Sequence, residues 1–349
     1  MRVRFRRGIL VLAGLICLST VLVIGCNGVQ NESFVSNRIM LGTTCKITTW
    51  DKDTDFNAVW KKIAELEKTI SAHDETSELA KLNGKAGGEW VTVSPILYQA
   101  VSQALEIAGL SDGAFNPAIG VLVDLWGIGE YVENKANEIN PDNVAAPVIP
   151  SDSEIAEALK HIDWHSIELK TAEDGSFMIR IKDKGTEINL GGIGKGIAAD
   201  IAAAELARQG VSSALMNFGG NVMCLGARTD GDKFRIGIQI PFEERNNYSQ
   251  VLKVSDSSVV TSGTYEKYFV DADGVLYHHI FDGGTGFPAR TGLLSVTIVG
   301  PSSAVCDGLS TACFVLGLER ATQLIGMMKG YGAIFIEEDS TVVPVGIEL

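Results

Sequence analysis

The chain has 349 residues, 46% of them hydrophobic and 21% charged, which is typical of a globular protein with one large domain or two small ones. Its formal net charge of −14 argues against a nucleic-acid-binding protein, which would carry a basic face. An anionic ligand would therefore need a bound cation or a local positive site, and we expect a metal.

Residues 1–25 have the pattern of a secretory signal. Four arginines between positions 2 and 7 precede an apolar run over 8–22, and Gly25-Cys26 follows. The Gly-Cys pair resembles a bacterial lipobox, in which Cys26 would be lipidated and become the mature N-terminus. An uncleaved anchor helix is the alternative, although the run is short for a membrane span. Either way we expect an extracytoplasmic protein held on a bacterial membrane, with residues 26–37 as a flexible tether.

The remaining cysteines, at positions 45, 224, 306 and 313, stand among apolar or small neighbours. Cys306 and Cys313 would lie ~10 Å apart on one helix, too far for a disulfide. Zinc spacing is absent from the sequence. Buried free thiols are therefore expected.

In the first half of the chain, apolar spacing predicts a strand over 39–48 and a helix over 55–70. Ser77 is expected to cap a short helix, and Ser94-Pro95 to open another that ends near Gly109. A turn-rich loop follows over 111–118. Residues 130–153 are polar and predict a surface loop, after which Asp152 or Ser153 caps a helix to Leu159.

A glycine-rich turn over 190–196 follows predicted strands at 166–170 and 177–182, and it precedes a predicted helix over 198–209. Backbone N–H groups and the helix dipole at such a turn can bind an anion, and Lys195 would add charge. Gly196 stands where a Walker A loop needs Ser or Thr. A simple tight turn is the alternative.

The second half alternates strands and helices less regularly. Strands are predicted within 211–222 and over 233–241, 252–254, 258–261, 292–299 and 333–336, all in one sheet, with helices over 304–316 and 319–328 separated at Gly317. Runs of adjacent strands favour an α+β fold over a regular parallel α/β fold.

Two groups of side chains indicate metal-assisted phosphate chemistry. Asp307 and Thr311 are four residues apart, so both can direct oxygen at one hard cation such as Mg²⁺. Asp307 could instead only favour the helix dipole. His278 and His279 precede Asp282, and strand alternation would let only one histidine face a pocket. A histidine near a carboxylate can act as a general base, although packed strand histidines are common.

Several separated motifs resemble those of the ApbE family of FAD:protein FMN transferases, which are exported bacterial flavin-handling lipoproteins. They cover the chain from about Met40 to Ile336 and are Ser77-Glu-Leu-x-x-Leu-Asn83, Gly113-Ala-Phe-Asn-Pro117, Leu125-Trp-Gly-Ile-Gly129, Leu190-Gly-Gly-Ile-Gly-Lys-Gly196, Asn217-Phe-Gly-Gly-Asn221, Thr261-Ser-Gly263, His279-x-x-Asp282, Thr285-Gly-Phe-Pro288 and Asp307-x-x-Ser-Thr311. The resemblance implies one large ApbE-like (T-fold-like) domain over 38–349, with mixed sheets flanked by helices.

The resemblance also implies roles for individual residues. Asp307, Thr311 and the Gly192 carbonyl would bind Mg²⁺, and His279 or Asp282 would assist deprotonation of the incoming hydroxyl. The residues expected to contact FAD are Met40, His73, Ala114, Phe115, Asn116, Asn189, Lys195, Thr261, Ser262, Gly263 and Ile280. His73 stands where the family often has Tyr, Asn116 and Asn189 stand where aspartates are common, and Gly283-Gly284 replaces a Pro and a basic residue.

The reaction implied by the resemblance is Mg²⁺-dependent transfer of FMN from FAD to a Thr or Ser hydroxyl of a target flavoprotein, with release of AMP. Membrane redox-pump subunits are the usual targets in the family. Two alternatives stay open: an FAD pyrophosphatase that gives FMN and AMP, and a flavin-binding lipoprotein without catalysis. The Asp307/Thr311 pair and the His-x-x-Asp motif favour catalysis.

Overall fold

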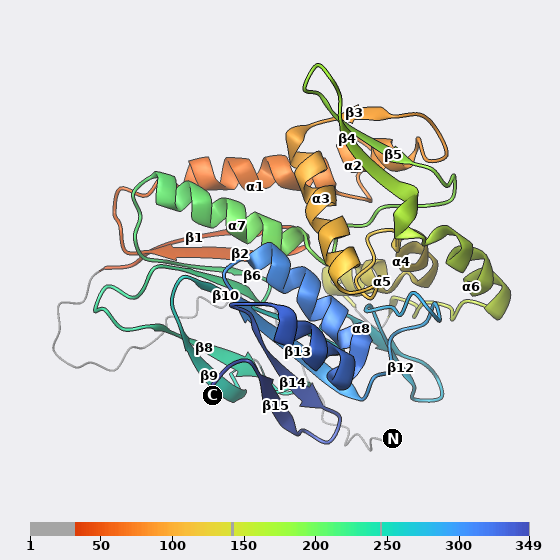
Figure 1. The fold of residues 1–349 in the computed structure, drawn as a ribbon. Coiled ribbons are helices and arrows are strands. Elements are labelled where there is room, and N and C mark those ends of the chain that lie inside the picture. The colour runs from red at the N-terminus through yellow and green to blue at the C-terminus, as the bar shows by residue number, and fades with distance from the viewer. Residues whose placement is uncertain (1–31, 141–142, 245, 349) are drawn as a thin grey trace.

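The computed structural model describes residues 32–140, 143–244 and 246–348; the expected signal over 1–25 and Cys26 lie outside them. Within these ranges eight strands form one antiparallel sheet in the order β1-β2-β6-β7-β10-β13-β14-β15 (Figure 1). Their bounds are β1 Phe34–Met40, β2 Thr43–Thr49, β6 Ala214–Phe218, β7 Asn221–Leu225, β10 Ser257–Gly263, β13 Leu293–Gly300, β14 Gly332–Glu337 and β15 Val342–Val345. Antiparallel strands with helices inserted between them confirm the α+β class.

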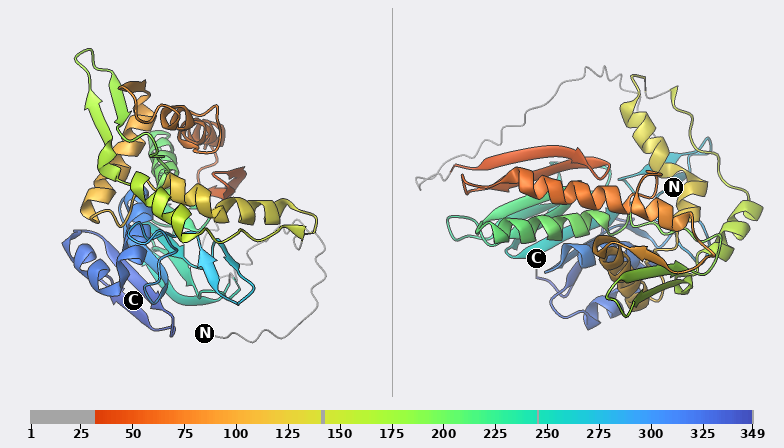
Figure 2. Two further views of the ribbon diagram at one scale, coloured as in Figure 1. Left: turned by 90° about the vertical axis from the view of Figure 1, so that its right-hand side faces the viewer. Right: turned by 90° about the horizontal axis from the view of Figure 1, so that it is seen from above.

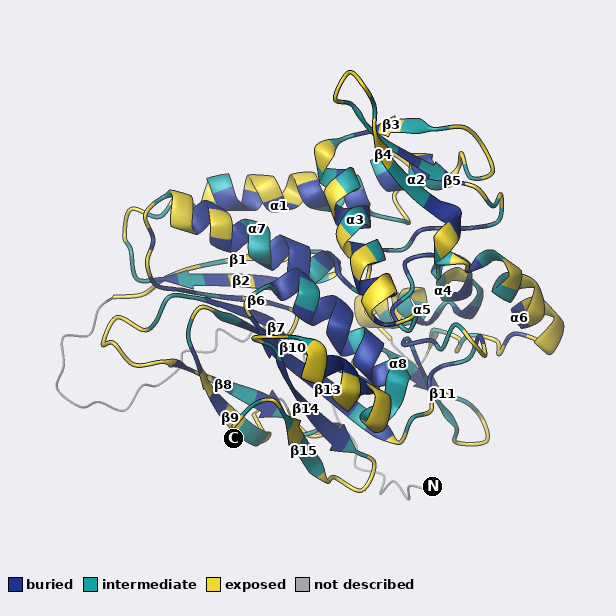
Figure 3. Cartoon of the chain, viewed as in Figure 1, coloured by how far each residue is buried: buried dark blue, intermediate teal, exposed yellow. Residues whose placement is uncertain are grey.

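Helices α1 (Phe56–Ile70), α7 (Gly194–Arg208) and α8 (Ser303–Met327) cover one face of this sheet, and α3 (Pro95–Leu110) packs across α1 and α8. Figure 2 shows the helices as a layer over the strands, and Figure 3 shows that the surfaces between them are buried. The expected apolar positions of α1, which include Val59 and Ile63, are fully buried in this core. None of the helices in the described ranges is both long and apolar enough to cross a bilayer.

The other face of the sheet is covered by a separate hairpin of β8 (Phe234–Gln239) and β9 (Tyr248–Val254). Its alternating apolar residues, among them Ile236 and Leu252, pack on Val259 and Ile334 of the sheet. The sequence placed these two strands in the main sheet, and that prediction was wrong. Alternation shows that a strand has one buried face, but it does not show which strand is its neighbour.

A smaller region lies at one end of the sheet (Figure 1). Its elements are α2 Glu78–Asn83, α4 Gly120–Trp126, α5 Ile128–Asn137, α6 Asp152–Ala158, the 3₁₀ turns η2 Leu159–His161 and η3 Trp164–Ser166, the three-stranded sheet of β3 Val91–Val93, β5 Phe177–Ile181 and β4 Ile167–Thr171, and the hairpin of β11 Tyr268–Val270 and β12 Leu276–His278. An aromatic cluster around Trp126 and Phe281 holds α4–α6 against that hairpin.

Several predicted boundaries need correction. Residues 128–137 form α5 rather than a surface loop, and the helix α6 is capped by Ser151 in a capping box with Glu154. Strand β1 begins at Phe34, so the last part of the expected tether belongs to the sheet. Helix α7 begins at Gly194, earlier than expected; in its first turn Gly194 lies against Ile70 of α1 and Gly196 against α8.

Other predicted boundaries are confirmed. Ser77 accepts a hydrogen bond from the Ala80 N–H at the start of α2, as the capping pattern indicated. Gly317 has a non-helical backbone (φ 73°, ψ 168°) that breaks α8 into two parts, which agrees with the two helices predicted there.

Candidate functional site

The first turns of α7 and α8 meet at Gly196. A Cβ built on Gly196 would lie 2.3 Å from the carbonyl oxygen of Ser303 and 2.6 Å from the Ala304 Cα, so only glycine allows this approach. At this contact the Gly196 N–H donates a hydrogen bond to Asp307 Oδ2 (2.9 Å). The sequence left open whether this turn binds an external anion or is a simple tight turn, and in the structure the Gly196 amide binds a carboxylate of the chain itself.

Asp307 is 3% exposed, and its Oδ1 lies 3.4 Å from the ammonium of Lys195. Burial raises the pKa of Asp307, while Lys195 and the Gly196 amide oppose that rise. The Lys195 side chain is 30% exposed, so it spans from the buried carboxylate toward solvent. Asp307 is therefore a buried carboxyl group whose charge partner is the partly exposed ammonium of Lys195.

Hydroxyl groups surround the next turn of α8. Ser262 Oγ, near the end of β10, lies 2.7 Å from Ser310 Oγ and 3.3 Å from Thr311 Oγ1. A Cβ on Gly192 would lie 3.6 Å from Thr311 Oγ1 and 3.1 Å from the Phe115 ring. The fold thus brings Gly192, Thr311, Ser262 and Phe115 together.

The other two candidate residues on β10, Thr261 and Gly263, make contacts within the protein. Thr261 shares a hydrogen bond with Thr297 across the sheet (2.8 Å between hydroxyl oxygens). Gly263 lies against the ring of Tyr265, which a Cβ would approach to 2.6 Å.

The loop that contains Ala114, Phe115 and Asn116 is tied to its surroundings by side chains. Asn116 Nδ2 donates to the Ile162 carbonyl (2.7 Å), and its Oδ1 accepts from the Ala118 N–H (2.9 Å). An aspartate could not donate to that carbonyl, which gives a physical reason for asparagine in this chain. A Cβ on Gly283 would lie 3.6 Å from Asn116 Nδ2, so the loop abuts the turn after Asp282.

Asn189 joins this loop to the glycine turn. Its N–H donates to the Pro117 carbonyl (2.8 Å), and its Oδ1 accepts from the Gly191 N–H (2.8 Å). The amide therefore shapes the approach to Gly192 through a local Asx turn.

The two neighbouring histidines have different environments. His278 is 4% exposed; its Nε2 lies 3.0 Å from the Ala289 carbonyl, and its Nδ1 accepts from the Ile280 N–H. Both ring nitrogens are thereby used, and burial lowers the pKa of His278 to about 4. His278 is thus a neutral packing residue, and Ile280 beside it is also buried.

His279 follows the end of β12, and its Nδ1 lies 3.1 Å from the Lys267 carbonyl. A carbonyl only accepts, so the neutral ring carries its proton on Nδ1 and leaves Nε2 as a lone-pair acceptor. Desolvation, the neighbouring His278 and the nearby Lys267 and Lys195 lower the pKa of His279 to about 3.

Asp282 supports its own turn. Its Oδ1 accepts from the Gly284 N–H (2.8 Å), and its Oδ2 lies 3.3 Å from the Thr285 hydroxyl. The turn is also held by Trp126, whose Nε1–H donates to the Gly286 carbonyl (2.9 Å). The sequence indicated Trp126 only as part of a motif. Its role in holding this turn follows from its burial and its hydrogen bond in the structure.

The last two candidate residues are Met40, at the end of β1, and the exposed His73. The Met40 carbonyl accepts from the Cys45 thiol (3.5 Å), and burial raises the pKa of that thiol to about 11. The His73 side chain is 74% exposed and its Nδ1 lies 4.0 Å from Asp124 Oδ1.

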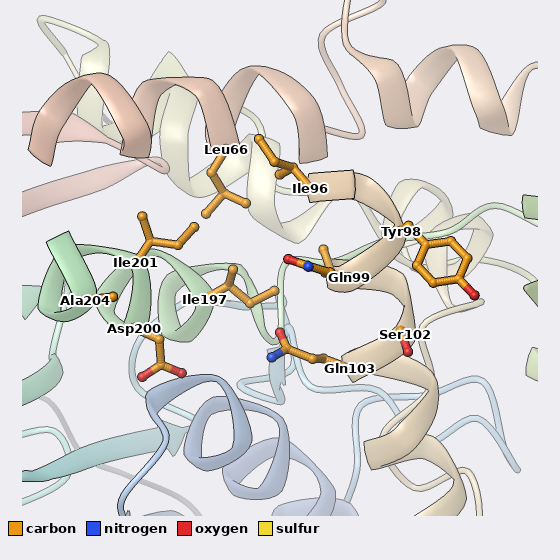
Figure 4. A pocket seen from close by; sticks show the side chains of 11 residues that line it. Leu66, Ile96, Tyr98, Gln99, Ser102, Gln103, Ile197, Asp200, Ile201 and Ala204 are labelled. Atoms are coloured by element: carbon orange, nitrogen blue, oxygen red, sulfur yellow. The ribbon is translucent and has the colours of Figure 1, made fainter. Parts of the chain in front are cut away.

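A separate cavity of about 410 Å³ lies between α1, α3 and α7 (Figure 4). Apolar side chains such as Ile197 and Ile201 line it together with Gln99 and Gln103. Asp200 at its margin accepts from the N–H groups of Ser303 and Ala304 and so supports the start of α8. The described residues that line this cavity include none of the site residues expected from the sequence.

Comparison with known proteins places this geometry in a family. The model of the ApbE family matches residues 41–335. The chain is 35% identical to the FAD:protein FMN transferase of Treponema pallidum, over 87% of this chain and 84% of that protein. It is 31% identical to the FAD:protein FMN transferase of Vibrio cholerae, over 86% of each.

Solved structures show the same fold. The ApbE protein of Thermotoga maritima superposes with a TM-score of 0.76 at 30% identity, covering 90% of this chain and 97% of that one. The flavin transferase ApbE of Vibrio cholerae superposes with a TM-score of 0.74 at 26% identity, with the same coverage.

Proposed function

We propose that this chain, which belongs to the ApbE family, transfers FMN from FAD to a Thr or Ser hydroxyl of a target flavoprotein and releases AMP. The observation that carries the proposal is the position of the buried Asp307, one helical turn from Thr311, whose hydroxyl lies against Gly192. Lys195 adds a cation that contacts the same carboxylate.

The residues expected to hold Mg²⁺ fit that ion. Asp307, Thr311 and the Gly192 carbonyl supply oxygen donors, which Mg²⁺ prefers, and Gly192 lies against Thr311. The described residues contain no group of three or more His, Cys, Asp or Glu side chains arranged for a metal. A site with a single carboxylate leaves room for oxygens of the substrate. When bound, Mg²⁺ would neutralise charge on the diphosphate of FAD.

His279 is the base that we favour. Its Nε2 would accept the proton of the target hydroxyl as that oxygen bonds to the phosphorus of the FMN half, and the bond from this phosphorus to the bridging oxygen breaks, so that AMP leaves. Asp282 has its two oxygens engaged with Gly284 and Thr285, which suits it to holding the turn. The low pKa of His279 keeps Nε2 unprotonated at neutral pH.

We further propose that the protein is anchored outside the cytoplasm by a lipid on Cys26. The basic, apolar and Gly-Cys pattern at the N-terminus supports this location. Strand β1 begins at Phe34, so only a short segment would separate the folded domain from the membrane surface. Subunits of membrane redox pumps, the targets expected from the family, would be within reach of such an enzyme.

The proposal is tested by incubating the protein with FAD, Mg²⁺ and a Thr-bearing fragment of a flavoprotein, followed by mass spectrometry and nucleotide analysis. We expect the fragment to gain the mass of FMN and AMP to appear in equal amount. Free FMN and AMP with an unlabelled fragment would show a pyrophosphatase. Intact FAD would show binding alone, and either result contradicts the proposed transfer.

A further inference from the structure

Asn221 lies at the first position of β7, directly after the Gly219-Gly220 turn, and it is 1% exposed. Its Oδ1 accepts a hydrogen bond from Ser303 Oγ (2.7 Å). Ser303 Oγ in turn accepts from Ser258 Oγ (2.8 Å). Three buried polar residues from β7, α8 and β10 thus form a chain of hydrogen bonds in the interior.

The direction of this chain is set by proton counting. An amide oxygen only accepts, so Ser303 must give its single hydroxyl proton to Asn221. The amide is therefore oriented with Oδ1 toward Ser303, which leaves Nδ2 on the other side. The reverse orientation would aim the amide oxygen toward the carboxyl group of Asp307, which is unfavourable.

Nδ2 of Asn221 is buried and makes no hydrogen bond of normal geometry within the described residues. An unsatisfied buried donor costs about 1–3 kcal/mol, so such an atom calls for an explanation. Asp307 lies one helical turn after Ser303 in α8, so its carboxyl group is on the same face of the helix as the hydroxyl that holds the Asn221 amide. The Asn221 amide also acts to lower the pKa of Asp307, against the larger effect of burial, which raises it. Asp307 also receives the Gly196 N–H and the Lys195 ammonium.

We propose that Asn221 is a positioning residue for Asp307, held by Ser303 and Ser258 so that its Nδ2–H restrains the carboxylate in the orientation that binds the divalent cation. This inference rests on the proposed metal site. The sequence contained Asn221 only as the last residue of the Asn217–Asn221 motif, without a role. Groups that orient a metal ligand typically change metal affinity 10–100-fold when they are removed.

The test compares Asn221→Leu, which keeps the volume of the side chain and removes its polar atoms, with Ser303→Ala, which removes only the group that orients the amide. Ser213→Ala is the matched control, because Ser213 Oγ is also buried without a partner but lies before β6, at the opposite end of the β6–β7 hairpin. The full-length protein in detergent is titrated with Mn²⁺ in the presence of FAD and absence of acceptor, and bound Mn²⁺ is measured by electron paramagnetic resonance. The Mg²⁺ concentration for half-maximal transfer and the melting temperature are measured in parallel.

We expect Asn221→Leu to weaken Mn²⁺ binding and to raise the Mg²⁺ requirement about tenfold or more, with much of the rate recovered at saturating Mg²⁺. Ser303→Ala should give a smaller shift of a few-fold, and Ser213→Ala none. A purely structural role would lower the melting temperature and leave the metal requirement of the folded protein unchanged. Wild-type metal affinity in folded Asn221→Leu contradicts the inference; if that variant does not fold, wild-type affinity in Ser303→Ala does so.

Asp307→Ala separates this inference from the proposed function. Loss of Mn²⁺ binding in Asp307→Ala but not in Asn221→Leu would contradict the role proposed for Asn221 and leave the proposed metal site standing. Undiminished Mn²⁺ binding in Asp307→Ala would remove the proposed metal site itself.

Discussion

The two parts of the site are held in place by different means. Asp307 and Thr311 lie on a buried helix whose first turn touches α7 through a glycine, so packing of backbone against backbone fixes them. His279 and Asp282 lie beyond the end of β12 in a loop that is held by hydrogen bonds to main-chain groups. A packed scaffold resists local change, whereas a loop can adjust to an incoming protein segment. We therefore expect rigid metal binding at one part and adaptable acceptor binding at the other.

Removal of the carboxylate should have the largest effect. Asp307→Ala is expected to lower the rate of FMN transfer by at least ~10³-fold, because metal stabilisation of transition-state charge is worth several kcal/mol. Asp307→Asn, which keeps the size of the side chain, should be nearly as inactive while remaining folded. Labelling of the Thr-bearing fragment, followed by mass, measures the loss. Undiminished labelling would remove Asp307 from the site.

His279→Ala should lower the transfer rate about 10²-fold or more, as expected for loss of a general base. Its Mg²⁺ requirement should stay unchanged, which distinguishes the loop from the helix part of the site. Asp282→Asn, which retains an acceptor for the turn, should cost less. Initial rates over a range of Mg²⁺ concentrations measure both quantities. A larger loss in Asp282→Asn than in His279→Ala would reverse the roles that we assign.

Gly196→Ala tests the packed contact directly. Its Cβ would meet main-chain atoms of Ser303 and Ala304, which cannot rotate away, and we expect a loss of about 3 kcal/mol in unfolding free energy. Gly326→Ala in the second part of α8 is the control, because nothing lies within 4 Å of its Cβ and alanine favours a helix. Thermal unfolding should show a lower melting temperature only for Gly196→Ala. Equal melting temperatures of the two variants would mean that α7 and α8 can move apart at Gly196 without loss of stability.

His278 should make stability depend on pH. Its pKa is about 4 in the folded protein against 6.5 for the free side chain, so the unfolded chain binds more protons between these values. The stability contributed by the neutral His278 ring is thus fully present above about pH 6.5 and is lost as pH falls toward 4. By pH 5 the loss in unfolding free energy is about 2 kcal/mol. His278→Gln should flatten this part of the profile of melting temperature against pH. An unchanged slope would show that His278 is not buried as a neutral ring.

Much of the fold could be predicted because local signals agreed with it. The apolar spacing of α1, the cap at Ser77 and the break at Gly317 depend on residues close in sequence, and all three are confirmed. The pairing of β8 with β9 alone, and the start of α7 at Gly194, depend on contacts between distant segments. Local periodicity carries no information about such partners.

The same distinction applies to the site. Asp307 and Thr311 could be identified as a pair because a helix brings residues four apart together. The contacts of Asp307 with Gly196 and Lys195 cross more than 100 positions of sequence, and the roles of Asn116 and Asn189 as loop ties depend on the carbonyl of Ile162 and the amide of Gly191. The strand alternation assumed for the two histidines does not apply, because β12 ends at His278, whose two ring nitrogens are both engaged.

The break at Gly317 divides the longest helix of the described chain into two segments with different surroundings. The segment before it is enclosed by protein, whereas the one after it carries exposed Glu319, Arg320 and Met327. Helical hydrogen bonds do not run unbroken through the break, so fraying at the outer end need not reach Asp307 and Thr311, the residues that we propose bind the metal. Amide exchange should accordingly be slow up to Leu316 and faster beyond Leu318, and evolution is free to vary the outer segment while the inner one stays constrained.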